Sequence, residues 1–158
     1  MPTRHEDWQQ TLNHRMWKAS QALHRTLNEE LAGLGLTINQ LALAVTLAQH
    51  APLSSADLAR SQGITPQTAN SALAHLDRLG WLERRPHPVH KRVVLLDLTK
   101  EGHVGVASGR ARTDAVVDRM RAALGGARQA EEFLAALRRV SDEFDGPDTP
   151  PGQLWPGR

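Results

Sequence analysis

The stretch from Ser54 to Gly80 constrains the fold of this chain more than any other segment, because its spacing predicts two short helices around a turn. Ser54 and Asp57 stand three residues apart, which is the spacing of a capping box at the start of a helix. We predict that this first helix runs over about residues 56–62. Gly63 follows it and is the residue best able to adopt the left-handed backbone conformation that ends a helix. A tight turn is therefore expected at Gly63.

A second helix is predicted to begin at Pro66, since proline is favoured at the first helical position, where its missing N–H leaves no bond unmade. Thr65 precedes it and offers a hydroxyl that can cap the helix. Spacings of three and four define a buried face that comprises Ala69, Ala72, Leu73 and Leu76. The opposite face is polar and carries Gln67, Thr68, Asn70, Ser71 and His75. Two such helices with a glycine turn predict a helix-turn-helix.

A β-hairpin is predicted directly after these helices. Residues 81–85 and 93–99 have the composition of strands, and a loop punctuated by prolines, residues 86–92, joins them. The positive charges of this hairpin are Arg84, Arg85, Lys91 and Arg92, with no acidic residue between them. His87 and His90 also lie in the loop. A basic loop beside a polar helix face is typical of contact with a DNA backbone and minor groove, whereas two short amphipathic helices alone also occur in proteins that bind no nucleic acid.

Composition limits the remaining classes of function. The chain has 158 residues, enough for one domain with a buried core, and a formal net charge of only +2, so its positive charge is local rather than general. It contains no cysteine, which excludes disulfides, thiolate metal sites and cysteine redox chemistry. No signal peptide and no segment long enough to span a membrane is visible. A soluble, cytoplasmic protein without a cofactor is therefore expected.

Two helices are predicted before the helix-turn-helix. Apolar residues that recur at steps of three and four predict one long amphipathic helix over residues 6–31, whose stripe packs on its own domain or on a second subunit. A capping box at Thr37 and an uncharged apolar run predict a buried helix over residues 38–48. Leu53 is expected in a short strand.

Two further helices are predicted after the hairpin. Thr99 can cap the first of them, although Gly102 and Gly105 weaken its opening turns. The second covers about residues 127–144. The tail that follows is rich in proline and glycine and is expected to be disordered, and Trp155 within it has no explanation.

In this order the elements are similar to those of the MarR family of winged helix-turn-helix transcription regulators. The resemblance spans about residues 6–144 and is carried by three segments, LTINQLALAVTLAQH, ADLARSQGITPQTANSALAHLDRLGWLERR and VVLLDLTKEG. It implies a mainly α fold with a small β-hairpin wing. The corresponding parts are an N-terminal dimerisation helix (1–36), a winged helix-turn-helix DNA-binding domain (37–99), C-terminal dimerisation helices (100–144) and a disordered tail (145–158).

The resemblance also implies a function. Members of this family are homodimers that place a recognition helix in the major groove and a wing in the minor groove of a pseudo-palindromic operator in double-stranded DNA. Many release DNA when a small aromatic ligand binds, so a dimeric, sequence-specific repressor with a small-molecule effector is expected. The residues expected to contact DNA are Ser55, Thr65, Pro66, Gln67, Thr68, Asn70, Ser71, His75, Arg84, Arg85, His87, Lys91 and Arg92. The residues expected near an effector are His14, Arg15, Trp17 and His50.

Two positions depart from the family pattern. His90 stands where the wing commonly carries an acid that orients Arg92. Ser71 stands where the recognition helix often carries an arginine. Base reading is then expected to rest on neutral amides and hydroxyls, with Asn70 or Gln67 able to contact adenine.

Two other classes of function stay open at this point. A winged-helix module that binds proteins would share the fold, and salt-dependent binding to duplex DNA would separate it from a regulator. A small enzyme is less favoured, because the sequence shows no Ser-His-Asp motif, phosphate-binding glycine loop or HExxH motif. His87 and His90 stand three residues apart, but no acidic ligand lies near them in sequence and no metal site is expected.

Overall fold

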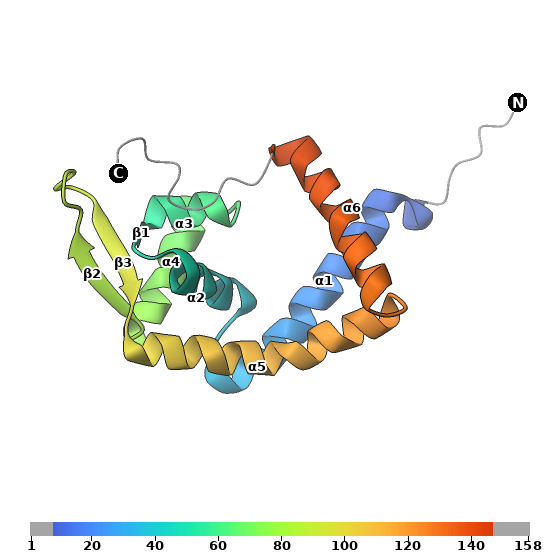
Figure 1. The fold of residues 1–158 in the computed structure, drawn as a ribbon, viewed down its shortest axis with the longest axis horizontal. Coiled ribbons are helices and arrows are strands. Elements are labelled where there is room, and N and C mark those ends of the chain that lie inside the picture. Colours follow the sequence, from blue (N-terminus) through green and yellow to red (C-terminus); the bar gives the residue numbers. More distant parts are fainter. Residues whose placement is uncertain (1–7, 147–158) are drawn as a thin grey trace, which may run out of the picture.

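Residues 8–146 are described by the computed structural model, and they form a mainly helical fold with one small sheet. The helices are η1 (Trp8–Gln10), α1 (Leu12–Leu31), η2 (Ala32–Leu34), α2 (Ile38–His50), α3 (Ser55–Ser61), α4 (Pro66–Arg78), α5 (Lys100–Ala123) and α6 (Ala127–Asp145), where η marks a 3-10 helix. The strands are β1 (Leu53–Ser54), β2 (Leu82–Pro86) and β3 (Val94–Leu98). Figure 1 shows α5 along one edge of the molecule, with the sheet and α2, α3 and α4 towards one end and α6 and the start of α1 towards the other.

The first long helix starts later than its apolar spacing predicts. α1 begins at Leu12 rather than at residue 6. Thr11 has an extended backbone, and its N–H donates to the Trp8 carbonyl at 3.2 Å, which closes a separate 3-10 turn over Trp8–Gln10. The Thr11 hydroxyl donates to the same carbonyl at 2.7 Å. The prediction of one continuous helix is therefore wrong at its start, and residues 6 and 7 lie outside the described chain.

Within residues 8–146, the apolar stripe of α1 is covered only towards the end of the helix. Leu31 is fully buried in the core, and Leu23 and Leu27 are half-buried. Towards the start of the helix, Leu12 is 75% exposed and Trp17 is 58% exposed. The first half of α1 therefore presents an apolar surface that no other part of residues 8–146 covers.

α2 is the central helix of the core, as its uncharged sequence predicts. The capping box is present, because the Thr37 hydroxyl accepts from the Gln40 N–H at 3.3 Å and Gln40 Oε1 accepts from the Thr37 N–H at 2.9 Å. α1, α4, α5 and β3 all contact this helix. Its buried residues are Leu41, Leu43, Ala44, Thr46 and Leu47. The helix extends to His50, two residues beyond its predicted end.

The wing grows out of a three-stranded antiparallel sheet with the strand order β1-β3-β2. β2 and β3 form the predicted hairpin, with Leu82 opposite Leu98. The short strand expected at Leu53 is also present, and Leu53 lies opposite Leu96 of β3. All four leucines are buried, so the sheet anchors the base of the wing in the core.

Glycine residues on α5 permit a close approach between this helix and the base of the wing. Thr99 caps α5 as predicted, because its hydroxyl accepts from the Gly102 N–H at 3.0 Å. A Cβ at Gly102 would lie 2.5 Å from the Trp81 carbonyl oxygen, and a Cβ at Gly105 would overlap the Trp81 ring. The helix is continuous over Lys100–Ala123. The two glycines disfavour a helix by propensity, but they are needed here because only a residue without a Cβ fits against Trp81.

The last helix reaches one residue into the predicted tail. α6 ends at Asp145, and Gly146 follows with a φ of +77°. The remainder of the tail, with Trp155, lies outside the described residues.

In the part of the chain that the structure describes, no single helix is long and apolar enough to span a membrane. Leu12–Leu34 and Ile38–His50 meet the length and composition criteria only when taken together, and they are bent by 76° relative to each other.

Candidate nucleic-acid interface

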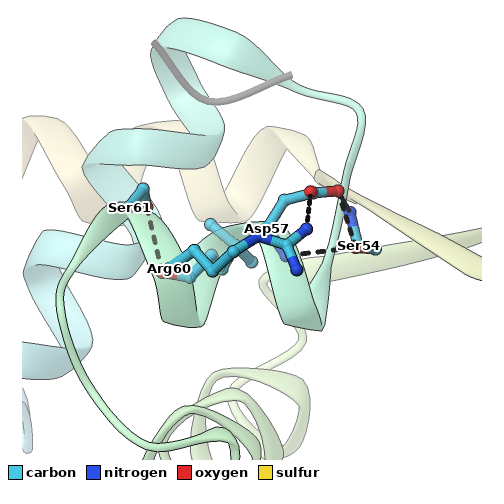
Figure 2. Close-up of polar contacts among 5 residues, drawn as sticks. Ser54, Asp57, Arg60 and Ser61 are labelled. Atoms are coloured by element: carbon cyan, nitrogen blue, oxygen red, sulfur yellow. Dashed lines mark hydrogen bonds and ion pairs between the residues drawn. The ribbon is translucent and has the colours of Figure 1, made fainter. Parts of the chain in front are cut away.

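The helix-turn-helix begins at a buried polar cluster (Figure 2). Ser54 and Asp57 form the predicted capping box, in which the Asp57 N–H donates to the Ser54 hydroxyl at 3.1 Å. Asp57 is only 2% exposed, and its carboxylate accepts from the Ser54 hydroxyl at 2.6 Å and from Arg60 Nη2 at 2.6 Å. Burial by itself raises the pKa of Asp57, but these bonds, the Ser54 backbone N–H and the Arg60 charge together hold the pKa below its usual range. An ionised carboxylate therefore fixes the start of α3.

Asp57→Asn is expected to lower the free energy of unfolding at pH 7 by about 1–2 kcal/mol, because a neutral amide replaces a charged acceptor of several donors. The folded-state pKa of Asp57 lies below its unfolded value. The carboxylate therefore stabilises the fold above about pH 4, and this contribution is lost as the pH falls through the folded-state pKa. Urea unfolding across a pH series is expected to show that variant and wild type converge in acid.

The matched control for Asp57 is Asp118→Asn. Asp118 also pairs with an arginine three residues away, Arg121, at 3.0 Å, but both side chains are more than half exposed. An exposed pair of this kind contributes at most about 1 kcal/mol. A stability difference between Asp57→Asn and wild type that stays constant from neutral to acid pH would contradict the role given to the carboxylate.

The turn and the second helix follow the predicted pattern. α3 spans Ser55–Ser61, one residue earlier than expected, and Gly63 has a φ of +59°. Ile64 packs against the core beneath the turn. The Thr65 hydroxyl accepts from the Thr68 N–H at 3.1 Å and lies 2.9 Å from the Thr68 hydroxyl. The four residues predicted for the inner face of α4 are all buried, and the helix-turn-helix is confirmed.

One row of side chains on α4 points directly away from its buried face. At 3.6 residues per turn this outward stripe consists of Gln67, Ser71, Ala74 and Arg78, all of them exposed. Asn70 and Thr68 are also exposed, on opposite flanks of the stripe. Arg78 is absent from the residues that the sequence predicts to contact DNA, because the predicted polar face ends at His75. Its position eleven residues after Gln67, on the same stripe, is the signal that identifies it.

A cavity of about 430 Å³ lies between the start of α3, α4 and the sheet. Ser55 and Asn70 line it together with Asp77, Arg78 and Arg84. Ser55 and Asn70 thus face a hollow between the helix and the wing, which Ala74 and Arg78 of the outward stripe also border, whereas Gln67 and Ser71 do not line it.

Two of the four wing cations are already paired within the subunit. Arg84 Nη2 lies 3.0 Å from a carboxylate oxygen of Asp77 on α4, and Arg85 Nη2 lies 2.6 Å from a carboxylate oxygen of Asp97 on β3. No acidic residue stands between Arg84 and Arg92 in the sequence, but the fold brings the carboxylates of Asp77 and Asp97 against two of these cations. The Arg84–Asp77 pair also joins β2 to α4 and sets the wing against the helix.

The loop of the wing is shaped by His87. Its Nδ1 accepts from the backbone N–H groups of Val89 at 3.1 Å and His90 at 3.0 Å, and its ring centroid lies 5.0 Å from that of His90. His87 is half-buried, so it organises the loop as well as lying near a candidate DNA surface. Lys91 and Arg92 follow on the same loop, are exposed, and take part in no ion pair with any residue between 8 and 146.

His75 is engaged inside the subunit. Its Nε2 lies 2.8 Å from the carbonyl oxygen of Gly35, in the link between α1 and α2, and its Nδ1 lies 3.3 Å from Nη2 of Arg78. The ring is half-buried. Both ring nitrogens therefore have partners, and the structure gives no support to the predicted contact between His75 and DNA.

The residues expected around an effector do not form one cluster in the subunit. The rings of His14 and Trp17 lie 5.9 Å apart, and Arg15 donates to Gln10 at 2.7 Å. His50 ends α2, and Figure 1 places α2 close to the sheet and away from the start of α1. Over residues 8–146 no hydrogen bond, ion pair or ring contact joins His50 to the other three, and no group of three or more His, Cys, Asp or Glu side chains could hold a metal ion.

Comparison with known sequences identifies proteins similar to this chain. A sequence model described as the MarR family matches residues 34–93. The chain is 31% identical over 86 residues to an uncharacterized HTH-type transcriptional regulator of Mycobacterium leprae, and the match covers 54% of this chain but only 60% of that protein. It is 29% identical over 132 residues to an HTH-type transcriptional repressor of Mycobacterium tuberculosis, which covers 84% of this chain and 94% of the repressor.

Solved structures share the arrangement of helices and wing. A MarR family protein of Mycobacterium tuberculosis in complex with salicylic acid has a TM-score of 0.66 and 29% identity, and the match covers 82% of this chain and 96% of that one. The transcriptional repressor CouR of Rhodococcus jostii, bound to a 23-mer DNA duplex, has a TM-score of 0.77 at 19% identity, covering 89% of this chain and 98% of CouR. At that identity the likeness to CouR shows the fold alone.

Proposed function

Because the chain belongs to the MarR family of helix-turn-helix transcription regulators, we propose that it is a homodimeric repressor that binds a pseudo-palindromic operator in double-stranded DNA. Members of this family regulate transcription and are not enzymes. The observation that carries the proposal is the outward stripe of α4, which is exposed, is polar except at Ala74, and stands beside a wing whose loop carries Lys91 and Arg92. The relative solved with a 23-mer duplex, CouR, is a repressor with this fold.

The proposed roles separate base reading from phosphate contact. The amino-terminal half of α4 enters the major groove, where the amides of Gln67 and Asn70 can each make a bidentate pair with adenine. Lys91 and Arg92 lie against the phosphates at the minor groove and supply affinity that does not depend on sequence. Arg84 and Arg85 hold the wing through their carboxylate partners and contribute less to the phosphate contacts than their charge alone suggests.

The exposed apolar side chains on α1 and α6 support a dimer. They include Leu12 and Trp17 on α1, and Phe133, Leu134 and Phe144 on α6. Several large apolar side chains left exposed on α1 and on α6 favour a protein–protein contact over exposure to water. A two-fold dimer would present two α4 helices to half-sites about 34 Å apart, one turn of DNA.

A small aromatic acid is the proposed effector. The related Mycobacterium tuberculosis protein was solved with salicylic acid. In this chain Trp17 offers a ring for stacking and Arg15 a guanidinium for a carboxylate, with His14 beside Trp17. His50 is left out of this site, because it lies with α2 near the sheet.

Footprinting on the DNA that flanks the coding region of this chain is the first test of the proposed function. In parallel, the wild-type protein is used to enrich a duplex from a randomised library, and the most enriched sequence, called the selected duplex below, is compared with a scrambled duplex of the same composition. A repressor protects a two-fold symmetric site, and its affinity falls steeply as salt rises. A protein that enriches no sequence and shows no salt-dependent binding would be a winged-helix module for protein partners.

Asn70→Ala is expected to weaken binding to the selected duplex by roughly 1–3 kcal/mol and to leave binding to the scrambled duplex nearly unchanged. The reason is that an amide contact to a base edge discriminates between sequences, whereas the phosphate contacts of Lys91 and Arg92 do not. Fluorescence anisotropy at one fixed salt concentration measures both affinities.

Asn39→Ala is the matched control, since Asn39 is an exposed asparagine on α2, outside the helix-turn-helix. It should bind both duplexes as the wild type does. Equal losses on both duplexes for Asn70→Ala would mean that Asn70 positions the protein without reading sequence. No loss on either would mean that α4 does not lie in the groove as proposed.

A further inference from the structure

The two ring nitrogens of His75 have partners that fix its tautomer. The Gly35 carbonyl can only accept, so Nε2, at 2.8 Å from its oxygen, carries the proton. The Arg78 guanidinium can only donate, so Nδ1, at 3.3 Å from Arg78 Nη2, carries none. In this arrangement His75 donates through Nε2 and accepts through Nδ1, so it is the middle member of a relay of hydrogen bonds from Arg78 to the main chain at Gly35.

This relay of hydrogen bonds connects the C-terminal end of α4 to the link between α1 and α2. Gly35 has a φ of +66° and lies between η2 and α2, forty residues before His75. On the other side of α4, Asp77 pairs with Arg84 of the wing at 3.0 Å. The last two turns of α4 are thus held by polar contacts on both flanks, in addition to the buried leucines of the inner face.

Arg78 is the last residue of α4, at the end of the helix that would leave the major groove if the amino-terminal half entered it. It lies eleven residues after Gln67 on the outward stripe, which at 1.5 Å per residue is about 16 Å along the helix axis. The major groove is about 12 Å wide. A helix that inserts Gln67 among the bases would therefore bring Arg78 to the strand that borders the groove, where phosphates lie.

We propose that Arg78 anchors a DNA phosphate and that His75 is the positioning residue that holds its guanidinium in place. The proposal rests on the proposed function, since it requires α4 to enter the major groove. It supplies the cation that the predicted recognition face lacks between Pro66 and His75. It also gives His75 a role in DNA binding without a contact of its own.

The test measures the affinity for the selected and the scrambled duplex across a salt series. Arg78→Gln removes the charge but keeps an N–H donor for His75, and is expected to weaken binding to both duplexes about tenfold. Its plot of log affinity against log salt should be shallower by about 0.9 for each phosphate that the protein no longer neutralises, or about 1.8 for a dimer. Arg121→Gln is the control, because Arg121 is an exposed arginine near the far end of α5.

His75 is tested with two substitutions. His75→Leu breaks both hydrogen bonds and leaves Arg78 in place, so its salt dependence should become as shallow as that of Arg78→Gln. His75→Gln can still donate to Gly35 and accept from Arg78, and should restore the wild-type slope. His103→Leu, on the exposed surface of α5, controls for the loss of a histidine.

A residue with a purely structural role would lower affinity without changing the salt slope. A wild-type slope in His75→Leu, or wild-type affinity and slope in Arg78→Gln, would therefore overturn the proposal while leaving the proposed function intact. Circular dichroism shows whether each variant is folded. If His75→Leu is unfolded, the result for Arg78→Gln tests the proposal, because Arg78 is exposed and its replacement leaves the core intact. A wild-type protein that binds neither duplex would instead remove the proposed function, and this inference with it.

Discussion

The double variant Leu12→Glu, Leu134→Glu is expected to be a monomer and to bind the selected duplex roughly 10²–10⁴-fold more weakly than the wild type. Leu12 is 75% exposed on α1 and Leu134 is 48% exposed on α6, so neither is required by the core of its own subunit. In the proposed dimer both side chains are covered, and an unpaired carboxylate buried there costs several kcal/mol. Each monomer would then bind one half-site independently, without the gain in affinity that comes from linking two binding events.

Sedimentation equilibrium measures the assembly, and fluorescence anisotropy measures the affinity. Val104→Glu is the matched control, because Val104 is 67% exposed on α5 and lies on neither α1 nor α6. Deleting residues 1–31 would test the dimer less clearly, since it also removes Leu31, which is fully buried in the subunit core. A double variant that remains dimeric, or a monomer that binds the duplex as tightly as the wild type, would contradict the proposed assembly.

The features that the sequence predicts correctly are those fixed by residues close together in the chain. Ser54 with Asp57, Thr37 with Gln40, and Thr65 ahead of a proline each cap a helix within three or four residues. A capping side chain needs only the first turn of its own helix, so its partner is known before the fold is known. Helix periodicity then gives the buried face of α4 and, with the hairpin, the winged helix-turn-helix.

The contacts that sequence reasoning misses join residues far apart in the chain. Asp77 on α4 neutralises Arg84 on β2, and His75 reaches Gly35 across forty residues. No local signal marks such partners, because they depend on how α2, α4 and the wing pack together. In the folded chain the positive charge of Arg84 is balanced by Asp77, and His75, a member of the polar face of α4, is bonded to the main chain at Gly35.

The start of α1 and the expected effector residues show a second limit. Apolar spacing continues through Trp8, but the Thr11 N–H and hydroxyl both donate to the Trp8 carbonyl and close a turn, and the helix starts at Leu12. Periodicity detects a face and is insensitive to a break of a few residues within it. The family resemblance alone places His50 with His14. In the structure α2, which ends at His50, lies away from the start of α1, so the two residues do not meet.

Gly102→Ala is expected to lower the free energy of unfolding by about 3 kcal/mol, although alanine is the better helix former by about 1 kcal/mol. The new Cβ would lie 2.5 Å from the Trp81 carbonyl oxygen and 3.1 Å from Leu98 Cδ2. The carbonyl cannot move aside cheaply, because it is a backbone atom that accepts from the Thr99 N–H at 3.0 Å. Moving α5 away instead would stretch the cap, in which the Thr99 hydroxyl accepts from the Gly102 N–H at 3.0 Å. Either relaxation breaks a hydrogen bond at the joint between α5 and the wing.

Urea unfolding at one protein concentration measures the loss of stability, because the stability of the proposed dimer would depend on concentration. Gly33→Ala is the control: a Cβ there would have only Arg112 Nη1 near it, at 3.9 Å, and the substitution should change stability by no more than about 1 kcal/mol. If α5 and the wing did not meet at Trp81, the two variants would behave alike, with Gly102→Ala stabilised by its higher helix propensity. A destabilised Gly102→Ala beside an unchanged Gly33→Ala would locate the effect in the packing of α5 on Trp81, the contact that joins the proposed dimerisation helices to the proposed DNA-binding wing.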